Sequence, residues 1–244
     1  MDRLSTFASK IWIMATGEYY QYTVFTIITL VVTLSAIKAV SGQASAFQRY
    51  LGGIHPLIMI FILYIAGMVM ISVLMRDGEF AVFRKGDYKG ILTAAALTIP
   101  FAIVVTIVDM NWPFPKDMNV PYPHSIFFYP AIGYIVDILF HLLPFGLLYI
   151  LLGKIFPSTD GGWIIWVCIL GAAIFEPALQ VVYAGSSDSP GIPVFVAVHL
   201  LLINIVQLIL FVKFDFLSMY SFRLVYYLWW HIIWGYMRLG ILFQ

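Results

Sequence analysis

Long apolar runs, separated by short breaks that are polar or rich in proline and glycine, occupy most of this chain. A run of about 20 mainly apolar residues is long enough to cross the hydrocarbon core of a bilayer as an α-helix. The pattern predicts seven such spans, at roughly residues 22–41, 55–75, 90–109, 128–153, 162–184, 192–213 and 219–242. We therefore expect an all-α fold, a polytopic membrane helix bundle of about seven spans.

The segment before the first span has a different, amphipathic pattern. Leu4, Phe7 and Ile11 recur at helical spacing, opposite the charged side chain of Lys10. Such a helix places its apolar face in the headgroup region and keeps its charged face in water. We expect residues 1–21 to form an interfacial helix that lies on the membrane.

The chain shows neither an internal repeat nor a low-complexity tract. We expect one transmembrane domain over residues 1–244, with the helix bundle at 22–244. We also expect no secretory signal, because residues 1–17 lack a long apolar core followed by a small-residue cleavage site.

Composition agrees with a membrane protein and excludes several other classes. The chain is 62% hydrophobic and only 10% charged, whereas a soluble surface is roughly 25–35% charged. A net charge of +1 gives no basic surplus for nucleic acid. The single cysteine, Cys168, excludes an intrachain disulfide framework and CxxC motifs, so any metal would need histidine and carboxylate ligands.

The distribution of Lys and Arg predicts the orientation, because cytoplasmic loops carry an excess of these residues. The N-terminal segment and the loops after the second, fourth and sixth spans hold nine of them: Arg3, Lys10, Arg76, Arg84, Lys85, Lys89, Lys154, Lys213 and Arg223. The other side holds four: Lys38, Arg49, Lys116 and Arg238. We expect a cytoplasmic N-terminus, in either a bacterial inner membrane or an organelle membrane.

Two loops stand out between the spans. Residues 76–90 concentrate charge, and we interpret them as a positive-inside anchor. Residues 111–124 hold four prolines among aromatic residues. Proline stiffens the backbone, so this second loop is either a cap over the mouth of the bundle or a docking surface.

Five titratable side chains fall inside the predicted spans, where charge is costly and often functional. They are Asp137, His141, Glu176, His199 and His231. With a rise of about 1.5 Å per residue, their depths below the predicted outer helix ends are roughly 10–20 Å. We expect these five residues to form one polar cluster.

This set of residues allows three uses. Asp137 and His141 are four residues apart and share a helix face, and carboxylate with imidazole serves acid–base catalysis or a Zn or Fe site. Alternatively, Asp137 and Glu176 pair with histidines only to satisfy buried polarity and hold helices together. Pro144 and Pro177 favour function, because they loosen backbone pairing nearby.

A cofactor is the third alternative. His141, His199 and His231 lie on three spans, and facing imidazoles can bind haem or a metal. Trp229 and Trp230 lie too centrally in the last span for a simple interfacial belt. We expect them to pack inside the bundle, with pigment, quinone or lipid contact as the alternative.

The order of these motifs resembles the CPBP family, the intramembrane proteases related to the CAAX prenyl endopeptidase. That family carries Glu-Glu-x-x-x-Arg on one helix, Phe-x-x-x-His on the next, and His-x-x-x-Asn two helices later. The first motif and its flank are similar to VDILFHLLPFGLLYILLGKIFP. Val136 and Asp137 stand at the positions of the two glutamates, and His141 stands at that of the arginine.

The other two motifs follow in the same helix order. The second resembles CILGAAIFEPAL, with Ala172 for phenylalanine and Glu176 for histidine. The third resembles FDFLSMYSFRLVYYLWWHIIWG, which keeps His231 and has Gly235 for asparagine. The resemblance covers roughly residues 125–240.

In the family, the first glutamate activates water, and the histidine and asparagine help to form the oxyanion site. The substitutions leave two interpretations open. We favour a CPBP-like protein that has lost peptidase activity and serves as an accessory or assembly subunit, with the bilayer and other membrane proteins as partners and no required cofactor. The alternative is an intramembrane hydrolase in which Asp137 or Glu176 is the general base and His231 polarises the substrate.

Overall fold

The chain is all-helical in a computed structural model that describes residues 2–76, 80–86, 88–157, 161–183 and 191–243, with no strand among them. Ten α-helices and two π-helical segments follow one another in these residues. Their bounds are α1 Asp2–Leu51, α2 Pro56–Met75, α3 Lys89–Asn111, α4 Ser125–Val136, η1 Asp137–Leu142, α5 Leu143–Ile155, α6 Gly161–Ala173, α7 Phe175–Tyr183, α8 Gly191–Lys213, α9 Phe216–Tyr227, η2 Leu228–Trp234 and α10 Gly235–Leu242.

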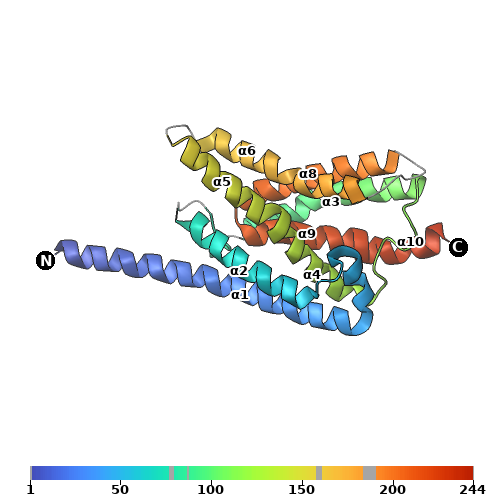
Figure 1. The fold of residues 1–244 in the computed structure, drawn as a ribbon, viewed down its shortest axis with the longest axis horizontal. Coiled ribbons are helices and arrows are strands. Elements are labelled where there is room, and N and C mark those ends of the chain that lie inside the picture. The colour runs from blue at the N-terminus through green and yellow to red at the C-terminus, as the bar shows by residue number, and fades with distance from the viewer. Residues whose placement is uncertain (1, 77–79, 87, 158–160, 184–190, 244) are drawn as a thin grey trace.

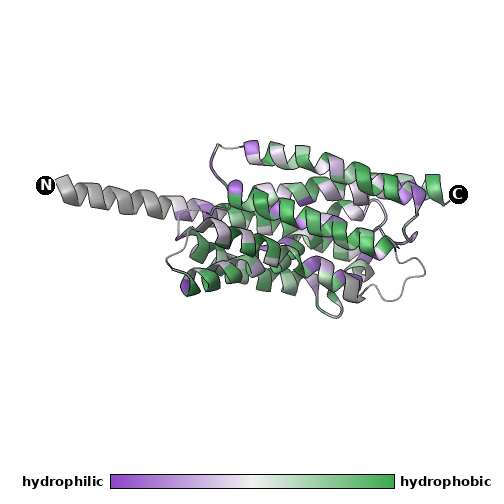
Figure 2. Cartoon of the chain, turned by 90° about the horizontal axis from the view of Figure 1, so that it is seen from above, coloured by the Kyte–Doolittle hydropathy of each residue, from purple (hydrophilic) through white to green (hydrophobic). Residues whose placement is uncertain are grey.

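Six helical stretches among the described residues are long and apolar enough to cross a membrane. They are Gly17–Leu51, Pro56–Met75, Lys89–Asn111, Ser125–Ile155, Gly161–Gln180 and Gly191–Lys213. Hydrophobic residues cover most of the length of these helices, and hydrophilic residues concentrate near helix ends and loops (Figure 2). This architecture fits an integral, multi-pass membrane protein whose apolar helices face lipid.

The seventh predicted span is helical but is not among these six. Residues 216–242 run through α9, η2 and α10 without interruption. This stretch includes Arg223, His231 and Arg238 together with several Tyr and Trp residues, so its composition is less apolar. Its first part, α9, lies inside the bundle in contact with α3, α4 and α8 (Figure 1), whereas α10 carries exposed side chains such as Tyr236.

The first helix differs from the predicted arrangement. A separate helix over residues 1–21 is not present, because α1 continues from Asp2 to Leu51 and its one non-helical residue is Gln43. The sequence holds no proline in this range that would end the helix earlier. The N-terminal part of α1 projects beyond the other helices (Figure 1). Its position on the membrane surface stays a prediction.

The helices divide into two groups that meet at α9. The first group packs α1, α2, α4 and α5 together, and the second packs α3, α6, α7 and α8. α5 and α6 join the groups at one side, and α9 bridges α4 to α3 and α8 in the interior. Side chains carried by α9 and η2 therefore reach both groups.

The loop at residues 76–90, predicted as a charged anchor, is also tied to the bundle by hydrogen bonds over its described part. Gln21 Oε1 accepts from the backbone N–H groups of Val82 and Phe83, at 2.7 and 2.9 Å. Asp215 Oδ2 accepts from the N–H of Arg84 at 3.0 Å, while Oδ1 caps α9 through the N–H of Ser218 at 2.7 Å. The loop thereby fixes the start of α9.

Candidate functional site

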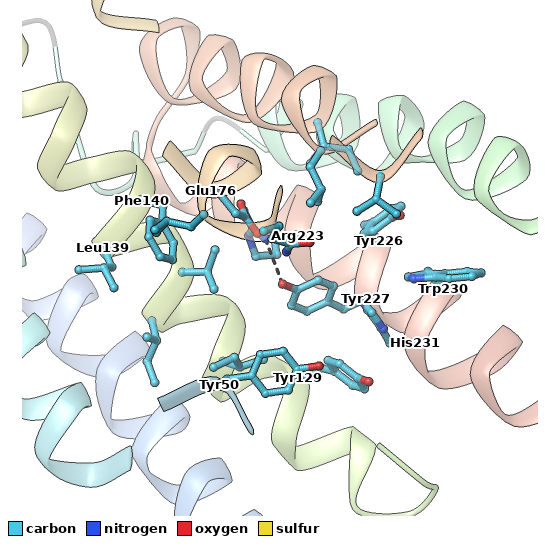
Figure 3. A pocket seen from close by; sticks show the side chains of 18 of the residues that line it. Tyr50, Tyr129, Leu139, Phe140, Glu176, Arg223, Tyr226, Tyr227, Trp230 and His231 are labelled. Carbon is cyan, nitrogen blue, oxygen red and sulfur yellow. Dashed lines mark hydrogen bonds and ion pairs between the residues drawn. The ribbon is translucent and has the colours of Figure 1, made fainter. Parts of the chain in front are cut away.

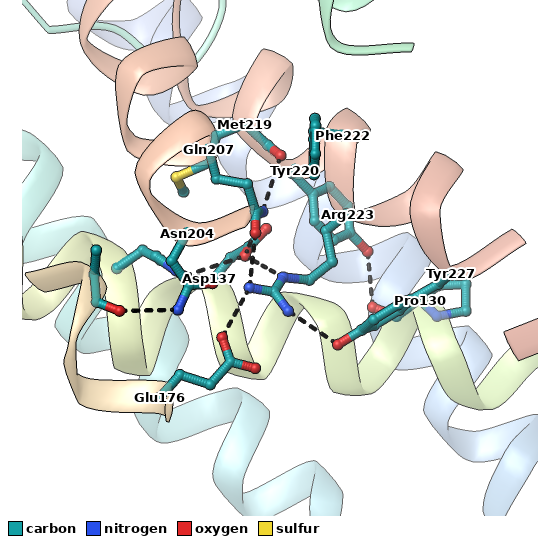
Figure 4. A network of polar contacts seen from close by, with 12 residues as sticks. Pro130, Asp137, Glu176, Asn204, Gln207, Met219, Tyr220, Phe222, Arg223 and Tyr227 are labelled. Atoms are coloured by element: carbon teal, nitrogen blue, oxygen red, sulfur yellow. Dashed lines mark hydrogen bonds and ion pairs between the residues drawn. The ribbon is translucent and has the colours of Figure 1, made fainter. Parts of the chain in front are cut away.

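Four polar side chains from four helical segments meet inside the bundle (Figure 4). Asp137 begins η1, Glu176 lies in α7, Gln207 in α8 and Arg223 in α9. The Arg223 guanidinium donates to Asp137 Oδ1 through Nε at 2.5 Å, and through Nη2 to Glu176 Oε2 at 3.2 Å and Gln207 Oε1 at 2.9 Å. We call these four residues the Arg223 cluster.

The Arg223 cluster is buried, so its hydrogen bonds replace hydration that the charges have lost. Arg223 is 2% exposed and Asp137 is 0% exposed. Gln207 Nε2 donates to Asp137 Oδ1 at 3.1 Å, and the Tyr227 hydroxyl accepts from Arg223 Nη1 at 3.0 Å. Two carboxylates contact one guanidinium, so the cluster has one more acidic than basic group.

His141 lies beside this cluster without completing it. Its Nδ1 is 3.4 Å from Asp137 Oδ1, close enough for an ion pair but without hydrogen-bond geometry. Both ring nitrogens of His141 and Asp137 Oδ2 are buried without a hydrogen-bond partner. Residues 137–142 form a π-helical turn, which is frequent at functional sites. Pro144, which has no N–H, lies two residues after the end of this turn and favours a departure from α-helical pairing.

Glu176 lies just after a break between α6 and α7. Pro177 lacks an N–H, so the Ala173 carbonyl four residues earlier has no helical donor. Asn204 Nδ2 from α8 donates to that carbonyl at 3.1 Å. A side chain from a neighbouring helix thus satisfies the backbone at the proline, as membrane helices require, and the break brings Glu176 to Arg223.

Arg223, the centre of the cluster, was the main residue that sequence reasoning placed wrongly. The positive-inside argument counts it as a cytoplasmic loop charge although the predicted span at 219–242 contains it, and it lies two turns inside α9. A local signal was available: Asp215 is a preferred N-cap residue, and its side chain accepts from the backbone N–H of Ser218 at the start of the helix at Phe216. The span prediction instead began at residue 219.

The two remaining predicted cluster residues lie apart from Arg223, which corrects the expectation of one five-residue cluster. His199 Nε2 hydrogen-bonds the Tyr226 hydroxyl at 3.1 Å. His231 Nδ1 hydrogen-bonds Asn119 Oδ1 at 2.6 Å, and its ring stacks on Tyr129 with centroids 4.4 Å apart. The five residues have similar predicted depths in the membrane, but depth does not determine which way a side chain points around its helix or which helices are neighbours.

Asn119 comes from the proline-rich loop and takes a place beside His231 that no sequence motif indicated. Its Nδ2 is buried without a partner. A Cβ on Gly235 would lie 2.8 Å from that nitrogen, so glycine at 235 leaves room for the Asn119 amide. The loop amide thus lies against His231 and Gly235, which are four residues apart on the last helix.

A cavity of about 660 Å³ connects these groups (Figure 3). Glu176, Gln207 and Arg223 line it at one part, and His199 and His231 line it elsewhere. The other walls are mainly apolar and aromatic side chains of α4, α8, α9 and η2. The cavity lining includes neither Asp137 nor His141. Of the predicted acids, only Glu176 is accessible to a ligand.

A second buried arginine occupies the C-terminal helix. Arg238 was assigned to an exposed side of the membrane, but it is 0% exposed and donates to both oxygens of Asp109, at 2.6 and 2.7 Å. Trp234 Nε1 and the Phe114 N–H also donate to Asp109, at 2.7 and 2.8 Å. Without Arg223 and Arg238, the charge count becomes eight against three, so the predicted orientation keeps its basis.

Metal ligation finds no ready geometry in the described part of the chain, where no group of three or more His, Cys, Asp or Glu side chains is placed to hold an ion. The three histidines proposed for haem or metal have separate surroundings. His141 lies at Asp137, His199 at Tyr226 and His231 at Asn119.

Comparisons with known proteins give no match: no family model, no curated protein and no solved structure resembles this chain. The CPBP resemblance therefore depends on the motifs quoted above.

Proposed function

We propose that this chain is a CPBP-like membrane protein without peptidase activity, and that it serves as an accessory or assembly subunit of a larger membrane complex. The observation that carries this proposal is the environment of Val136 and Asp137. Val136, at the position of the family's water-activating glutamate, lines the cavity, whereas Asp137 does not. An isopropyl group cannot act as a base.

The hydrogen bonding of Asp137 supports a structural role for that residue. Its Oδ1 accepts from Arg223 and Gln207, and its side chain is 0% exposed. A general base needs to reach the proton it removes, directly or through one water. In this arrangement Asp137 holds α9 and α8 against η1 and is hidden from anything bound in the cavity.

A sizing experiment tests the subunit part of the proposal. The chain is purified from its native membrane in a mild detergent, and the mass of the protein in the micelle is measured by light scattering. We expect a stable assembly clearly heavier than the 27.7 kDa chain. A monomeric chain that is functional without any partner protein would contradict it.

A second candidate, an intramembrane hydrolase, is favoured by one specific observation. His231 and Glu176 line the same cavity, and His231 is hydrogen-bonded to Asn119, whose Nδ2 has no partner. In this version Glu176 is the general base, and His231 with Asn119 polarises a carbonyl. The pair would replace the family's histidine and asparagine with residues from two different segments.

A cleavage assay separates the two candidates. Wild type, Glu176→Gln, His231→Ala and Asp137→Asn are given a farnesylated CAAX peptide, with an active CAAX endopeptidase as the positive control. The non-catalytic proposal expects no cleavage above the uncatalysed rate by any of the four. Cleavage by wild type that is lost in Glu176→Gln and His231→Ala would overturn it and support the hydrolase.

A further inference from the structure

The cavity described above has the size and position of a site for a lipid-like molecule. Liquid water occupies about 30 Å³ per molecule, so a cavity of about 660 Å³ holds a ligand of roughly 20 non-hydrogen atoms. Its walls include residues of α4 and α8, which are among the membrane-spanning candidates. A ligand that reaches it from the bilayer needs an apolar body.

Apolar side chains line most of the cavity on both sides of its polar part. Ile132 and Leu139 lie on the α4 and η1 side, and Leu179, Leu200 and Ile203 lie on the α7 and α8 side. Pockets for small ligands typically combine such walls with a few placed polar groups that select one end of the ligand. The polar groups of this part of the cavity are Glu176, Gln207 and Arg223, and the lining elsewhere includes Arg49, Gln180, His199 and His231.

These polar groups favour a ligand that donates hydrogen bonds. The Arg223 donors are already directed at Asp137, Glu176, Gln207 and Tyr227, so the guanidinium is committed to partners within the protein. Glu176 accepts one of those hydrogen bonds through Oε2 and still lines the cavity. A carboxylate is an acceptor when ionised.

The charges point the same way, because the other cation in the lining, Arg49, already has an aspartate partner outside the cluster. Asp137 and Glu176 give two carboxylates against the one guanidinium of Arg223. His141, the titratable group beside Asp137, is buried and does not line the cavity. A cation at Glu176 would balance the cluster from the cavity side, where hydration is limited.

Aromatic rings also line the cavity. Tyr227, whose hydroxyl accepts from Arg223, lies next to the cluster, and Tyr226, Tyr129 and Trp230 line the cavity farther from Glu176 (Figure 3). The faces of aromatic rings attract alkylammonium groups, most strongly where water is excluded. Carboxylate and rings together select an ammonium group over a carboxylate or phosphate.

We propose that this cavity binds a single-chain amphiphile with a cationic amine head, the ammonium at Glu176 beside Tyr227 and the chain along the apolar walls. The site would operate equally in a lone chain or in a subunit of a complex. It therefore stands independently of the function proposed above.

The first test compares three ligands of equal chain length on the delipidated full-length protein in a nonionic detergent. Octadecylamine, octadecanol and stearic acid are titrated, and native mass spectrometry gives each dissociation constant. We expect octadecylamine to bind tightest and stearic acid weakest. Equal binding of all three, tighter binding of the acid, or no binding of the amine would overturn the proposal.

A second test uses variants with matched controls. Glu176→Gln should weaken octadecylamine by about tenfold or more, the loss of one charge-assisted contact, and octadecanol by less than about twofold. Glu18→Gln makes the same chemical change on an exposed residue of α1 and should leave both unchanged. Octadecylamine binding that survives Glu176→Gln would also overturn the assignment.

A third pair of variants decides the site even where Glu176→Gln fails to fold. Leu200→Trp places a larger side chain in the cavity, and Leu202→Trp places the same one on the exposed face of the same helix. We expect the first to weaken octadecylamine by about tenfold or more, as the apolar contacts of several methylene groups are lost, and the second to have no effect. Equal effects would contradict a site in this cavity.

Discussion

Two buried arginines, Arg223 and Arg238, are held in different ways. Arg238 faces a single carboxylate, Asp109, whose two oxygens both accept hydrogen bonds from it. Arg223 faces two carboxylates, and Asp137 Oδ2 is left without a partner. Arg238 is sealed from the cavity, whereas Arg223 lines it.

This difference separates a structural ion pair from a site that can respond to a ligand. The Asp109–Arg238 pair is matched in charge and also bonded to Trp234 and to the backbone at Phe114 and Pro115. It ties α10 to the end of α3 and to the proline-rich loop. The Arg223 cluster is unmatched in charge and open on one side, the combination expected where a further group binds.

The largest effect should come from breaking the sealed pair. Arg238→Met leaves the Asp109 carboxylate buried without its cation, so we expect a loss of about 3–5 kcal/mol in the free energy of unfolding. Reversible unfolding in mixed micelles measures it. The double variant Asp109→Leu with Arg238→Met removes both charges and should recover at least half of the loss. A single-variant loss below about 1 kcal/mol would show that the pair is not a structural anchor.

Breaking the open cluster should cost less. Arg223→Met leaves two carboxylates in the interior, but water in the cavity can hydrate Glu176, so we expect about 2–4 kcal/mol in the same unfolding assay. Adding Asp137→Asn should restore more stability than adding Glu176→Gln, because Asp137 lies closer to the guanidinium, at 2.5 Å against 3.2 Å, and is fully buried. If Glu176→Gln restored more stability than Asp137→Asn, Glu176 and not Asp137 would be the structural partner of Arg223.

The wall that carries Glu176 can be weakened separately. Asn204→Leu removes the donor to the Ala173 carbonyl at the proline break and should cost about 1–2 kcal/mol. Adding Pro177→Ala supplies a helical N–H to the same carbonyl and should recover most of that loss. No recovery would mean that Asn204 acts through another contact.

The smallest effect is expected at the contact between the proline-rich loop and η2. Gly235→Ala would bring a Cβ within 2.8 Å of Asn119 Nδ2 and should cost about 1 kcal/mol through overpacking. Gly153→Ala, where a Cβ meets nothing within 4 Å, is the helical control and should be neutral or slightly stabilising. Asn119→Ala should relieve the Gly235→Ala cost. Equal results at both glycines would remove the steric argument.

Six of the seven predicted spans correspond to candidate membrane helices, and they could be predicted because bilayer thickness imposes a minimum length of about 20 apolar residues on a crossing helix. The prolines also indicated where helices are interrupted: Pro144 follows η1, and Pro177 lies at the break that positions Glu176. These features depend on residues close together in the chain.

The site could be predicted only in part, because its partners are far apart in sequence. Asp137 and Arg223 are 86 residues apart, and Asp109 and Arg238 are 129 apart. A buried arginine and an arginine in a loop have the same hydropathy, so the count of Lys and Arg on each side of the membrane included Arg223 and Arg238 together with the loop residues. The cap at Asp215 was the local feature that could have separated them.

The π-helical turn at 137–142 also determines where this helical stretch can lose a residue. A π-helical turn closes each hydrogen bond over one residue more than an α-helical turn, so one deletion within 137–142 can be absorbed by a return to α-helical pairing. One deletion in α4 would instead rotate η1 and α5 by about 100° relative to the start of α4. Phe145, which is fully buried between Phe80 and Phe211 with ring centroids 5.6 and 5.5 Å away, would then leave that position. A relative can therefore lack one residue between Asp137 and Leu142 and still keep the buried face of α5, and an alignment should place a single gap there and not in α4.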